Sequence, residues 1–320
     1  MPIETQSANP SSLLGANAPP KLKPDTFRRV QRFIYDTAGI DIQDGKEEMV
    51  TARLWKQTRR NSFPSIEAYL AAVERDGADP RGGDLLAGLI DCLTTNYTSF
   101  FREPAHFDFL RRRILPELKS RPRIPIWTAA SSTGEEPYSI AIALWEELGG
   151  AAAQRASVLA TDISTRVLKT ASLGVYPQDR FREFPDEWKR RYLLRGKGEN
   201  AGHFKIRPEI RSMVEFRRQN LMEGMPSEGP FPVVFLRNIM IYFDRTIQEK
   251  TVAAISSKIE PGGYLFIGHS ESLNGISHGL EHVQVAIYRK PPGGRYPDQD
   301  AANKAANEAS REAAKGRSSL

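Results

Sequence analysis

From Ile124 onward the sequence alternates between short apolar runs and amphipathic segments, and this rhythm limits the fold more than any other feature. IPIWTAA and SVLATD are typical of buried strands, and each is followed by a segment with helical spacing. PFPVVFLRN is likewise followed by TIQEKTVAAISSKI, while YLFIGHS and EHVQVAIYRK add further strands. Strands and helices that alternate in this way predict a parallel sheet with right-handed crossovers. We therefore expect an α/β domain over residues 93–290.

Two other regions have a different pattern. Residues 21–92 show helical spacing, which predicts a small all-helical domain with helix N-caps at Asp25 and Ser65. Residues 176–216 contain glycine-rich turns and the alternating runs HFKIR and MVEFR. These runs predict an antiparallel β-subdomain inserted into the α/β domain.

The two ends of the chain are poor in residues that a core could bury. Residues 1–20 are rich in Ser, Asn, Ala and Pro, and residues 291–320 open with Pro-Gly-Gly and continue as Ala, Asn, Glu and Lys. Such a composition predicts a disordered leader and a disordered tail.

Composition excludes several classes of protein. The 320 residues are 40% hydrophobic and 26% charged, a globular balance. There is no apolar run of about 18 residues and no signal peptide, so we expect a cytoplasmic protein that does not insert into the membrane. Cys92 is the single cysteine, which excludes an intramolecular disulfide and a thiolate zinc cluster. His278 and His282 lack the carboxylate frame of a metal site, so no metal is expected.

The net charge of +6 allows an acidic partner but does not choose among nucleic acid, anionic lipid and protein. The densest basic segment is RLWKQTRR, which contains Arg53, Lys56, Arg59 and Arg60. Helical spacing places most of these side chains on one face. That face is either solvated surface or a docking site.

The first strand-to-helix turn, TAASSTGEEPYS at Thr128–Ser139, occupies the position where an open α/β sheet binds its ligand. Its small residues allow a ligand to approach the backbone. The turn matches neither GxGxxG nor a P-loop, and Glu135 and Glu136 stand where a phosphate would bind. A cofactor with an adenosine, no phosphate and a positive charge fits better, and S-adenosylmethionine is the common one.

Other predicted strands also end in residues that could face this crevice. They are Asp162; Arg237 and Asn238, with Tyr242 one helical turn on; and Asn220 with Leu221. Asp162 either accepts hydrogen bonds from ribose hydroxyls or caps the next helix. An amide and an apolar side chain at Asn220 and Leu221 suit the wall around a purine.

In this order and spacing, NYTSFFREPAHF, AASSTGEEPYSIAIAL, ATDIS, QNL, RNIMIYF and PGGYLFIGHSES resemble the CheR family of chemotaxis receptor methyltransferases. The resemblance covers residues 27–290, and GEEPYS together with RN-x-x-IYF is a specific combination. It implies a helical domain followed by a class I, Rossmann-like methyltransferase domain that carries the inserted antiparallel subdomain. It also implies methyl transfer from S-adenosylmethionine to glutamate side chains of chemoreceptors, which yields S-adenosylhomocysteine and glutamate methyl esters for sensory adaptation.

Carried over residue by residue, the resemblance implies a set of cofactor contacts. They are Asn96, Thr98, Arg102, Glu136, Asp162, Asn220, Leu221, Arg237 and Asn238. The motif favours Glu136 over Glu135 as the contact. Arg102 and Tyr242 are the candidates to orient the incoming carboxylate, which is ionised near pH 7 and therefore needs no general base. Phe100 and Phe101 would pack beneath the segment that joins the two domains.

The resemblance also implies partners. The basic face of Arg53, Lys56, Arg59 and Arg60 becomes a docking surface for glutamate-bearing receptor helices. The edge of the β-subdomain could accept a receptor's C-terminal tail peptide as an added strand, as in some members of the family, and the sequence leaves this open. We expect the protein to act as a monomer.

Three other functions fit the sequence less well. A hydrolase would use GHSES, Gly268–Ser272, as a nucleophile elbow, but Ser272 stands where the last glycine is required. A nucleic-acid methyltransferase would need aromatic residues interleaved with the basic face, which the sequence lacks, so no nucleic acid is expected. A cofactor-binding signalling module without activity is disfavoured by the joint presence of Arg102, Glu136, Asp162, Asn238 and Tyr242.

Overall fold

The computed structural model describes residues 19–77, 83–94, 97–182 and 184–293. Apart from residues 19–20 and 291–293, the predicted leader and tail lie outside the described residues, and so does Asn96. No helix in the described part of the chain is long and apolar enough to cross a membrane.

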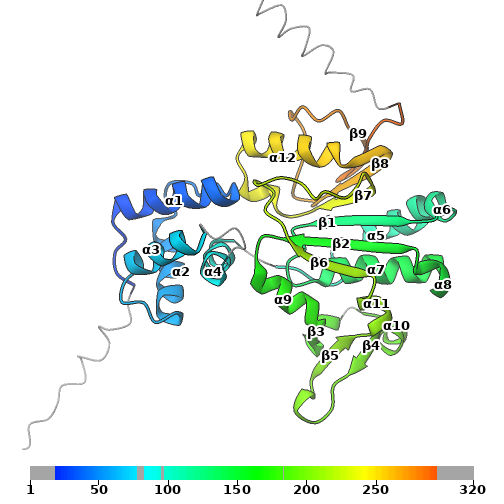
Figure 1. The fold of residues 1–320 in the computed structure, drawn as a ribbon, viewed down its shortest axis with the longest axis horizontal. Helices are drawn as coiled ribbons and strands as arrows, with labels where there is room; N and C mark the ends of the chain where they lie inside the picture. The colour runs from blue at the N-terminus through cyan, green and yellow to red at the C-terminus, as the bar shows by residue number, and fades with distance from the viewer. Residues whose placement is uncertain (1–18, 78–82, 95–96, 183, 294–320) are drawn as a thin grey trace, which may run out of the picture.

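Helices make up the first unit, which lies beside the sheet in Figure 1. They are α1 (Pro24–Ala38), α2 (Glu47–Arg60), α3 (Ile66–Gly77) and α4 (Asp84–Leu93). The unit has a core of its own, in which Ile34, Leu54 and Tyr69 are fully buried. The predicted helical domain is therefore present as a packed unit.

The two predicted N-caps of this unit had different outcomes. Ser65 caps α3, because its Oγ accepts a hydrogen bond from the backbone N–H of Ala68 at 3.1 Å. The prediction for Asp25 is wrong, since α1 already begins at Pro24 and Asp25 lies in its first turn. Proline has no N–H to donate, so it is well suited to open a helix, and an acid in the first turn still interacts favourably with the helix dipole.

A short segment joins the helical unit to the sheet. It contains α5 (Pro104–Phe109), the π-helical turn η2 (Leu110–Ile114) and α6 (Leu115–Leu118). Phe100 stacks on Phe181 with ring centroids 4.6 Å apart, and Phe101 packs edge-on against Phe107 at 5.0 Å. The two phenylalanines therefore anchor this segment in the aromatic core, as predicted.

The main sheet has seven strands in the order β6-β2-β1-β7-β8-β10-β9. The strands are β1 (Ile124–Ala129), β2 (Ala156–Asp162), β6 (Val214–Arg218), β7 (Phe231–Leu236), β8 (Ile259–Ile267), β9 (Glu281–Gln284) and β10 (Ile287–Arg289). The first five strands in this order are parallel, and β10 and β9 are antiparallel additions at one edge. The predicted parallel α/β sheet is confirmed.

Helices cover both faces of this sheet (Figure 1). They are α7 (Glu135–Leu148), α8 (Gly150–Ala153), α9 (Thr165–Leu173) and α12 (Arg245–Ser257). Val233 and Phe235 of β7 belong to the core on the α7 side, whereas Val234 and Leu236 belong to the core with α12. A strand covered on both faces must be apolar at every position, which explains the continuous run PFPVVFL.

The inserted subdomain is a three-stranded antiparallel sheet in the order β3-β5-β4. Its elements are β3 (Val175–Pro177), η3 (Gln178–Phe181), α10 (Asp186–Tyr192), β4 (Leu193–Arg195), η4 (Gly198–Asn200), β5 (His203–Ile206) and α11 (Pro208–Arg211). The run MVEFR is not part of it, contrary to our prediction: β6 pairs in parallel with β2 and forms the edge of the main sheet. An edge strand is half-exposed, so its alternation imitates an antiparallel ribbon.

Candidate cofactor and active site

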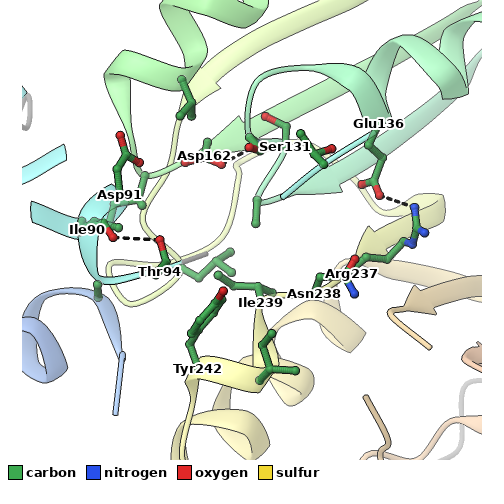
Figure 2. Close-up of a pocket in the computed structure, with 18 of the residues that line it drawn as sticks. Ile90, Asp91, Thr94, Ser131, Glu136, Asp162, Arg237, Asn238, Ile239 and Tyr242 are labelled. Atoms are coloured by element: carbon green, nitrogen blue, oxygen red, sulfur yellow. Dashed lines mark hydrogen bonds and ion pairs between the residues drawn. The ribbon is translucent and has the colours of Figure 1, made fainter. Parts of the chain in front are cut away.

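A cavity of about 250 Å³ opens at the carboxyl ends of the parallel strands. It is lined from both units, as Figure 2 shows: Ile90, Asp91 and Thr94 come from the end of α4, and Ser131 and Asp162 follow strands of the sheet. In open α/β sheets this edge is the usual position of a ligand site.

The loop after β1 forms one wall of the cavity by exposing its backbone. Ala130 and Ser132 adopt left-handed φ angles of 62° and 49°, and Gly134 has φ 98°. The N–H of Ser131 donates to the carbonyl of Thr161 at 2.8 Å, which fixes the loop to the end of β2. The small side chains of this loop leave its main chain accessible, so a ligand can approach it closely, as the sequence predicted.

Asp162 ends β2 and lies against the same loop. Its Oδ2 accepts from the N–H of Ser132 at 2.8 Å, and its Oδ1 accepts from the N–H of Ser164 at 2.9 Å. Burial raises the pKa of the Asp162 carboxyl to about 6, although these backbone amides oppose the shift. Ser164 caps α9 with its own hydroxyl, which accepts from Val167 N. The capping role is thus taken by Ser164, while Asp162 lines the cavity.

Glu136 and the buried Arg237 form an ion pair on another part of the wall (Figure 2). Arg237 Nη1 lies 2.6 Å from Glu136 Oε2, and the hydroxyl of Thr128 donates to Glu136 Oε1 at 2.5 Å. Arg237 Nη2 donates to the carbonyl of Arg102 at 2.6 Å and lies 2.9 Å from Glu103 Oε2. Arg237 therefore connects its own strand end, the first helix turn and the joining segment.

Glu135 points away from the cavity, so only one of the two adjacent carboxylates faces the ligand space. Its side chain is 1% exposed and its Oε2 accepts from the hydroxyl of Thr133 at 2.6 Å. Burial raises its pKa. Glu136 lines the cavity, which agrees with our choice between the two. Two free carboxylates therefore do not face a phosphate position here, contrary to our expectation, since Glu135 is buried and Glu136 is paired with Arg237.

The joining segment contributes Thr98 and Arg102 to the cavity lining. Arg102 Nη1 donates to the carbonyl of Tyr97 at 2.7 Å, and its guanidinium lies 5.6 Å from the Tyr97 ring centroid. Tyr242 belongs to the 3₁₀ turn η5 (Met240–Tyr242), and its ring points toward the cavity in Figure 2. Arg102 and Tyr242 therefore line one space, as their proposed shared role requires.

Asn220 lines the cavity, but its side-chain amide is already engaged. Nδ2 donates to the carbonyl of Thr37 at 2.7 Å, and Oδ1 accepts from the N–H of Met222 at 3.0 Å. The first of these bonds ties the end of α1 to the sheet domain. Leu221, beside it, supplies apolar lining. The amide of Asn220 thus holds the wall in place.

Of the predicted cofactor contacts, Asn96 lies outside the described residues and the other eight all line this cavity. No sequence pattern indicated the lining residues that the helical unit adds, which are Ala38, Ile40, Ile90, Asp91 and Thr94. Apolar residues on an amphipathic helix have the same pattern whether they face a core or a ligand.

Among the described residues, one cluster brings together side chains of the kinds that bind metal ions. Potential ligand atoms of Glu103, His106 and His269 lie within 4.8 Å of one another. However, Arg237 Nη2 lies 2.9 Å from Glu103 Oε2 and so already places a positive charge at this carboxylate. Burial and this guanidinium lower the pKa of His106 to about 3, so the same field opposes any added cation. His278 and His282 instead pack edge-on against Tyr288.

The predicted basic face on α2 divides into two parts. Arg53 Nη1 donates to the carbonyls of Cys92 and Leu93, both at 3.0 Å, and so closes the end of α4. The side chains of Lys56, Arg59 and Arg60 are exposed. Arg59 and Arg60 are in the last turn of α2, where positive charge is also favoured by the helix dipole.

Comparison with known proteins gives a consistent result. Residues 25–94 match the family described as CheR methyltransferase, all-alpha domain, and residues 96–289 match CheR methyltransferase, SAM binding domain. The chain is 37% identical over 265 residues to chemotaxis protein methyltransferase 2 of Pseudomonas aeruginosa, which covers 82% of this chain and 92% of that protein.

Two further relatives are similar over almost the same length. Identity is 41% over 253 residues to the chemotaxis protein methyltransferase of Klebsiella aerogenes and 38% over 252 residues to that of Escherichia coli. Each match covers 78% of this chain and 84% of the relative. Both family domains occur here in order, and the cavity lies where the methyltransferase domain meets the helical one. The chain therefore belongs to the CheR methyltransferase family, and S-adenosylmethionine is its cofactor.

Proposed function

We propose that this protein is a protein-glutamate O-methyltransferase that transfers a methyl group from S-adenosylmethionine to glutamate side chains of chemoreceptors. The observation that carries the proposal is the cavity between the two units, which brings Asp162, Glu136 and Asn238 together with Arg102 and Tyr242. The first three suit a nucleoside amino acid, and the last two suit a carboxylate substrate. Family membership supports the same reaction.

The residues present fit this cofactor. Asp162 can accept from ribose hydroxyls, because an ionised carboxylate has more acceptor sites than the two backbone amides occupy. Leu221, Ile163 and Ile90 supply apolar lining for an adenine. Glu136 offers a carboxylate to an ammonium or sulfonium group. These assignments, with Asn96, Thr98, Arg102, Asn220, Arg237 and Asn238, form the proposed cofactor-binding set.

The residues of this chain act by binding and orientation. When bound, S-adenosylmethionine supplies an electrophilic methyl group on a sulfonium centre. Arg102 and Tyr242 are proposed to hold the target carboxylate in line with that methyl group. The carboxylate is ionised near neutral pH, having an ordinary pKa of ~4.3, so no base has to remove a proton. Alignment and exclusion of water can together contribute ~7–11 kcal/mol to rate enhancement.

The exposed basic residues of α2 are the proposed docking surface for the receptor. Lys56, Arg59 and Arg60 present positive charge to helices that carry glutamates. Arg53 is not proposed to contact the receptor, because its guanidinium binds the carbonyls of Cys92 and Leu93 at the end of α4. Its role in this face is to stabilise the helical unit. Docking on the helical unit also suits a cavity that this unit helps to line.

The inserted subdomain is a proposed second contact with the receptor. β4 is at one edge of the three-stranded sheet, and Leu194 on it is 40% exposed. Such an edge can pair with an extended C-terminal tail peptide. We further propose a monomer that works in the cytoplasm, with a helical domain at residues 21–92 and a methyltransferase domain at residues 93–290.

A transfer assay with a chemical readout tests this function. The protein is incubated with methyl-labelled S-adenosylmethionine and either receptor cytoplasmic fragments or RNA. Label should appear on the receptor fragment and be released by mild base, because a carboxyl methyl ester hydrolyses readily. Base-stable label, or label on RNA alone, would contradict the proposal. A receptor fragment in which the target glutamates are replaced by alanine is the matched control.

A further inference from the structure

The carboxylate of Glu271 binds backbone amides from two neighbouring strand ends. Its Oε2 accepts from the N–H of Gly268 at 2.6 Å and from that of Asn238 at 2.9 Å. Its Oε1 accepts from the N–H of Met240 at 2.8 Å. Gly268 directly follows β8, Asn238 lies just after β7, and these two strands are parallel neighbours. One side chain thus connects the two loops.

The carboxyl group of Glu271 is buried and surrounded by backbone N–H donors. Burial raises the pKa of its carboxyl, and the leading opposing influences are four backbone amides, those of Gly268, Asn238, Met240 and Ile241. A carboxylate held by converging N–H groups forms charge-assisted hydrogen bonds, which are about twice as strong as neutral ones. These bonds fix the main chain of both loops.

The loop that Glu271 holds is a wall of the cofactor cavity. Asn238, Ile239, Ile241 and Tyr242 all line the cavity, and Asn238, Ile239 and Tyr242 are labelled in Figure 2. Asn238 has φ 58°, a left-handed conformation that costs a side-chain-bearing residue ~1 kcal/mol. Asparagine adopts this conformation more readily than most residues, and the bond from its N–H to Glu271 stabilises it there.

The side chain of Asn238 is placed by the same arrangement. A Cβ atom at Gly268 would lie 2.3 Å from Asn238 Nδ2 and 2.9 Å from Glu271 Oε2. The asparagine amide therefore lies directly against the glycine backbone. Gly268 thus packs against the side chain of Asn238, and Glu271 binds its backbone N–H. Two positions of the GHSES segment therefore have a structural role in placing Asn238.

We propose that Glu271 is a positioning residue for S-adenosylmethionine, acting through the backbone of the loop from Asn238 to Tyr242. It lies behind the cavity wall and fixes the residues that form its inner surface. The inference rests on the assignment of this cavity to the cofactor. Its consequence is that loss of the Glu271 carboxylate weakens cofactor binding in a protein that is still folded.

Glu271→Gln is the sharpest test, because it preserves size while replacing an acceptor oxygen with an NH₂ group that faces backbone donors. The affinity for S-adenosylhomocysteine is measured by calorimetry well below the melting temperature. We expect the dissociation constant to rise at least tenfold. Glu281→Gln, an exposed residue on β9, carries the same charge change and should bind as the unmodified protein does.

Hydrogen exchange separates a local role from a global one. In Glu271→Gln the amides of residues 238–241 should exchange faster, while those of α1–α4 and β1 remain protected. Glu271→Asp keeps the charge but is shorter, so it should lie between the parent and the glutamine variant in affinity.

The outcomes distinguish the assignment of the cavity to the cofactor from the positioning role of Glu271. If the unmodified protein does not bind S-adenosylhomocysteine, the assignment of the cavity fails. If it binds but a folded Glu271→Gln binds within twofold of Glu281→Gln, the role of Glu271 is overturned. Unfolding of both the glutamine and the aspartate variants at 10 °C would also overturn it, because Glu271 would then hold the fold rather than one wall.

Discussion

The guanidinium of Arg237 lies 2.6 Å from the carboxylate of Glu136, although 101 residues separate them in the chain. The same guanidinium reaches Glu103 and the carbonyl of Arg102, so one buried side chain fixes three segments around the cavity. Glu136 is therefore positioned, and part of its negative charge is compensated, before any cofactor binds.

Arg237→Lys should weaken cofactor binding while retaining the positive charge. A lysine presents one ammonium group and cannot bridge Glu136, Glu103 and a carbonyl in the planar arrangement of a guanidinium. We expect the dissociation constant of S-adenosylhomocysteine to rise about tenfold, equivalent to ~1.4 kcal/mol. Calorimetry measures it, and Arg28→Lys in an exposed ion pair on α1 is the control. Equal affinities in the two variants would show that the bridge does not matter for binding.

Cofactor affinity should depend on pH through Asp162, whose pKa is raised to about 6. The ionised form accepts hydrogen bonds from ribose hydroxyls, so affinity for S-adenosylhomocysteine should be constant above pH 7 and fall as pH drops below 6. Asp162→Asn should bind weakly with a flatter pH profile, whereas Asp25→Asn at an exposed site should keep the parent profile. A steep fall that persists in Asp162→Asn would assign the titration to another group.

The raised pKa of Asp162 affects cofactor affinity and folding stability in opposite directions as the pH falls. The folded-state pKa of Asp162 lies above the unfolded value of ~3.9, so its ionisation opposes folding above pH 6. This penalty disappears as the pH falls toward 4. Loss of affinity near pH 5 therefore cannot arise from unfolding driven by Asp162, and thermal melting at each pH checks this.

Charge reversal on α2 should affect the receptor and not the cofactor. Lys56→Glu combined with Arg60→Glu replaces two exposed positive charges with negative ones on the proposed docking surface. We expect KM for a receptor fragment to rise about tenfold at low salt, with unchanged affinity for S-adenosylhomocysteine, and the difference to shrink as salt screens the charges.

The matched control for this surface is Lys119→Glu with Arg123→Glu. Both residues are exposed near the start of β1, at the end of the strand away from the cavity. This double variant changes the net charge by the same amount as Lys56→Glu with Arg60→Glu. If both double variants raise KM equally, net charge rather than the α2 surface governs the encounter.

Gly134→Ala should destabilise the fold more than an alanine at a glycine with free space. A Cβ at Gly134 would lie 2.7 Å from the Tyr176 hydroxyl oxygen and 2.8 Å from Ala171 Cβ. Gly45 also has a positive φ, 84°, but its Cβ would meet nothing within 4 Å. Both variants incur backbone strain, and Gly134→Ala adds overpacking of ~1–3 kcal/mol in the free energy of unfolding. Denaturant unfolding measures the difference, and equal stabilities would contradict it.

The fold could be predicted from the sequence where burial leaves a local pattern. The strand β7 is apolar at every position because helices cover both of its faces, and this pattern identified a parallel sheet. The edge strand β6 was misassigned because its positions are mostly half-buried and alternate like those of a hairpin. The single strand expected in EHVQVAIYRK is two, β9 and β10, with Ala286 at φ 61° in the turn between them.

What the sequence determined by itself about this protein was the α/β class, the helical domain before it and the chemistry placed at the strand ends. Small residues, carboxylates and amides at those positions favoured S-adenosylmethionine, and the resemblance to the CheR family added the set of cofactor contacts. Tertiary structure alone decided that the Glu135 side chain is buried, that Arg53 binds the last carbonyls of α4, and that Glu271 positions Asn238. The physical reason is that these roles depend on contacts between segments far apart in the chain, and local sequence patterns do not record which distant partner satisfies a buried polar group.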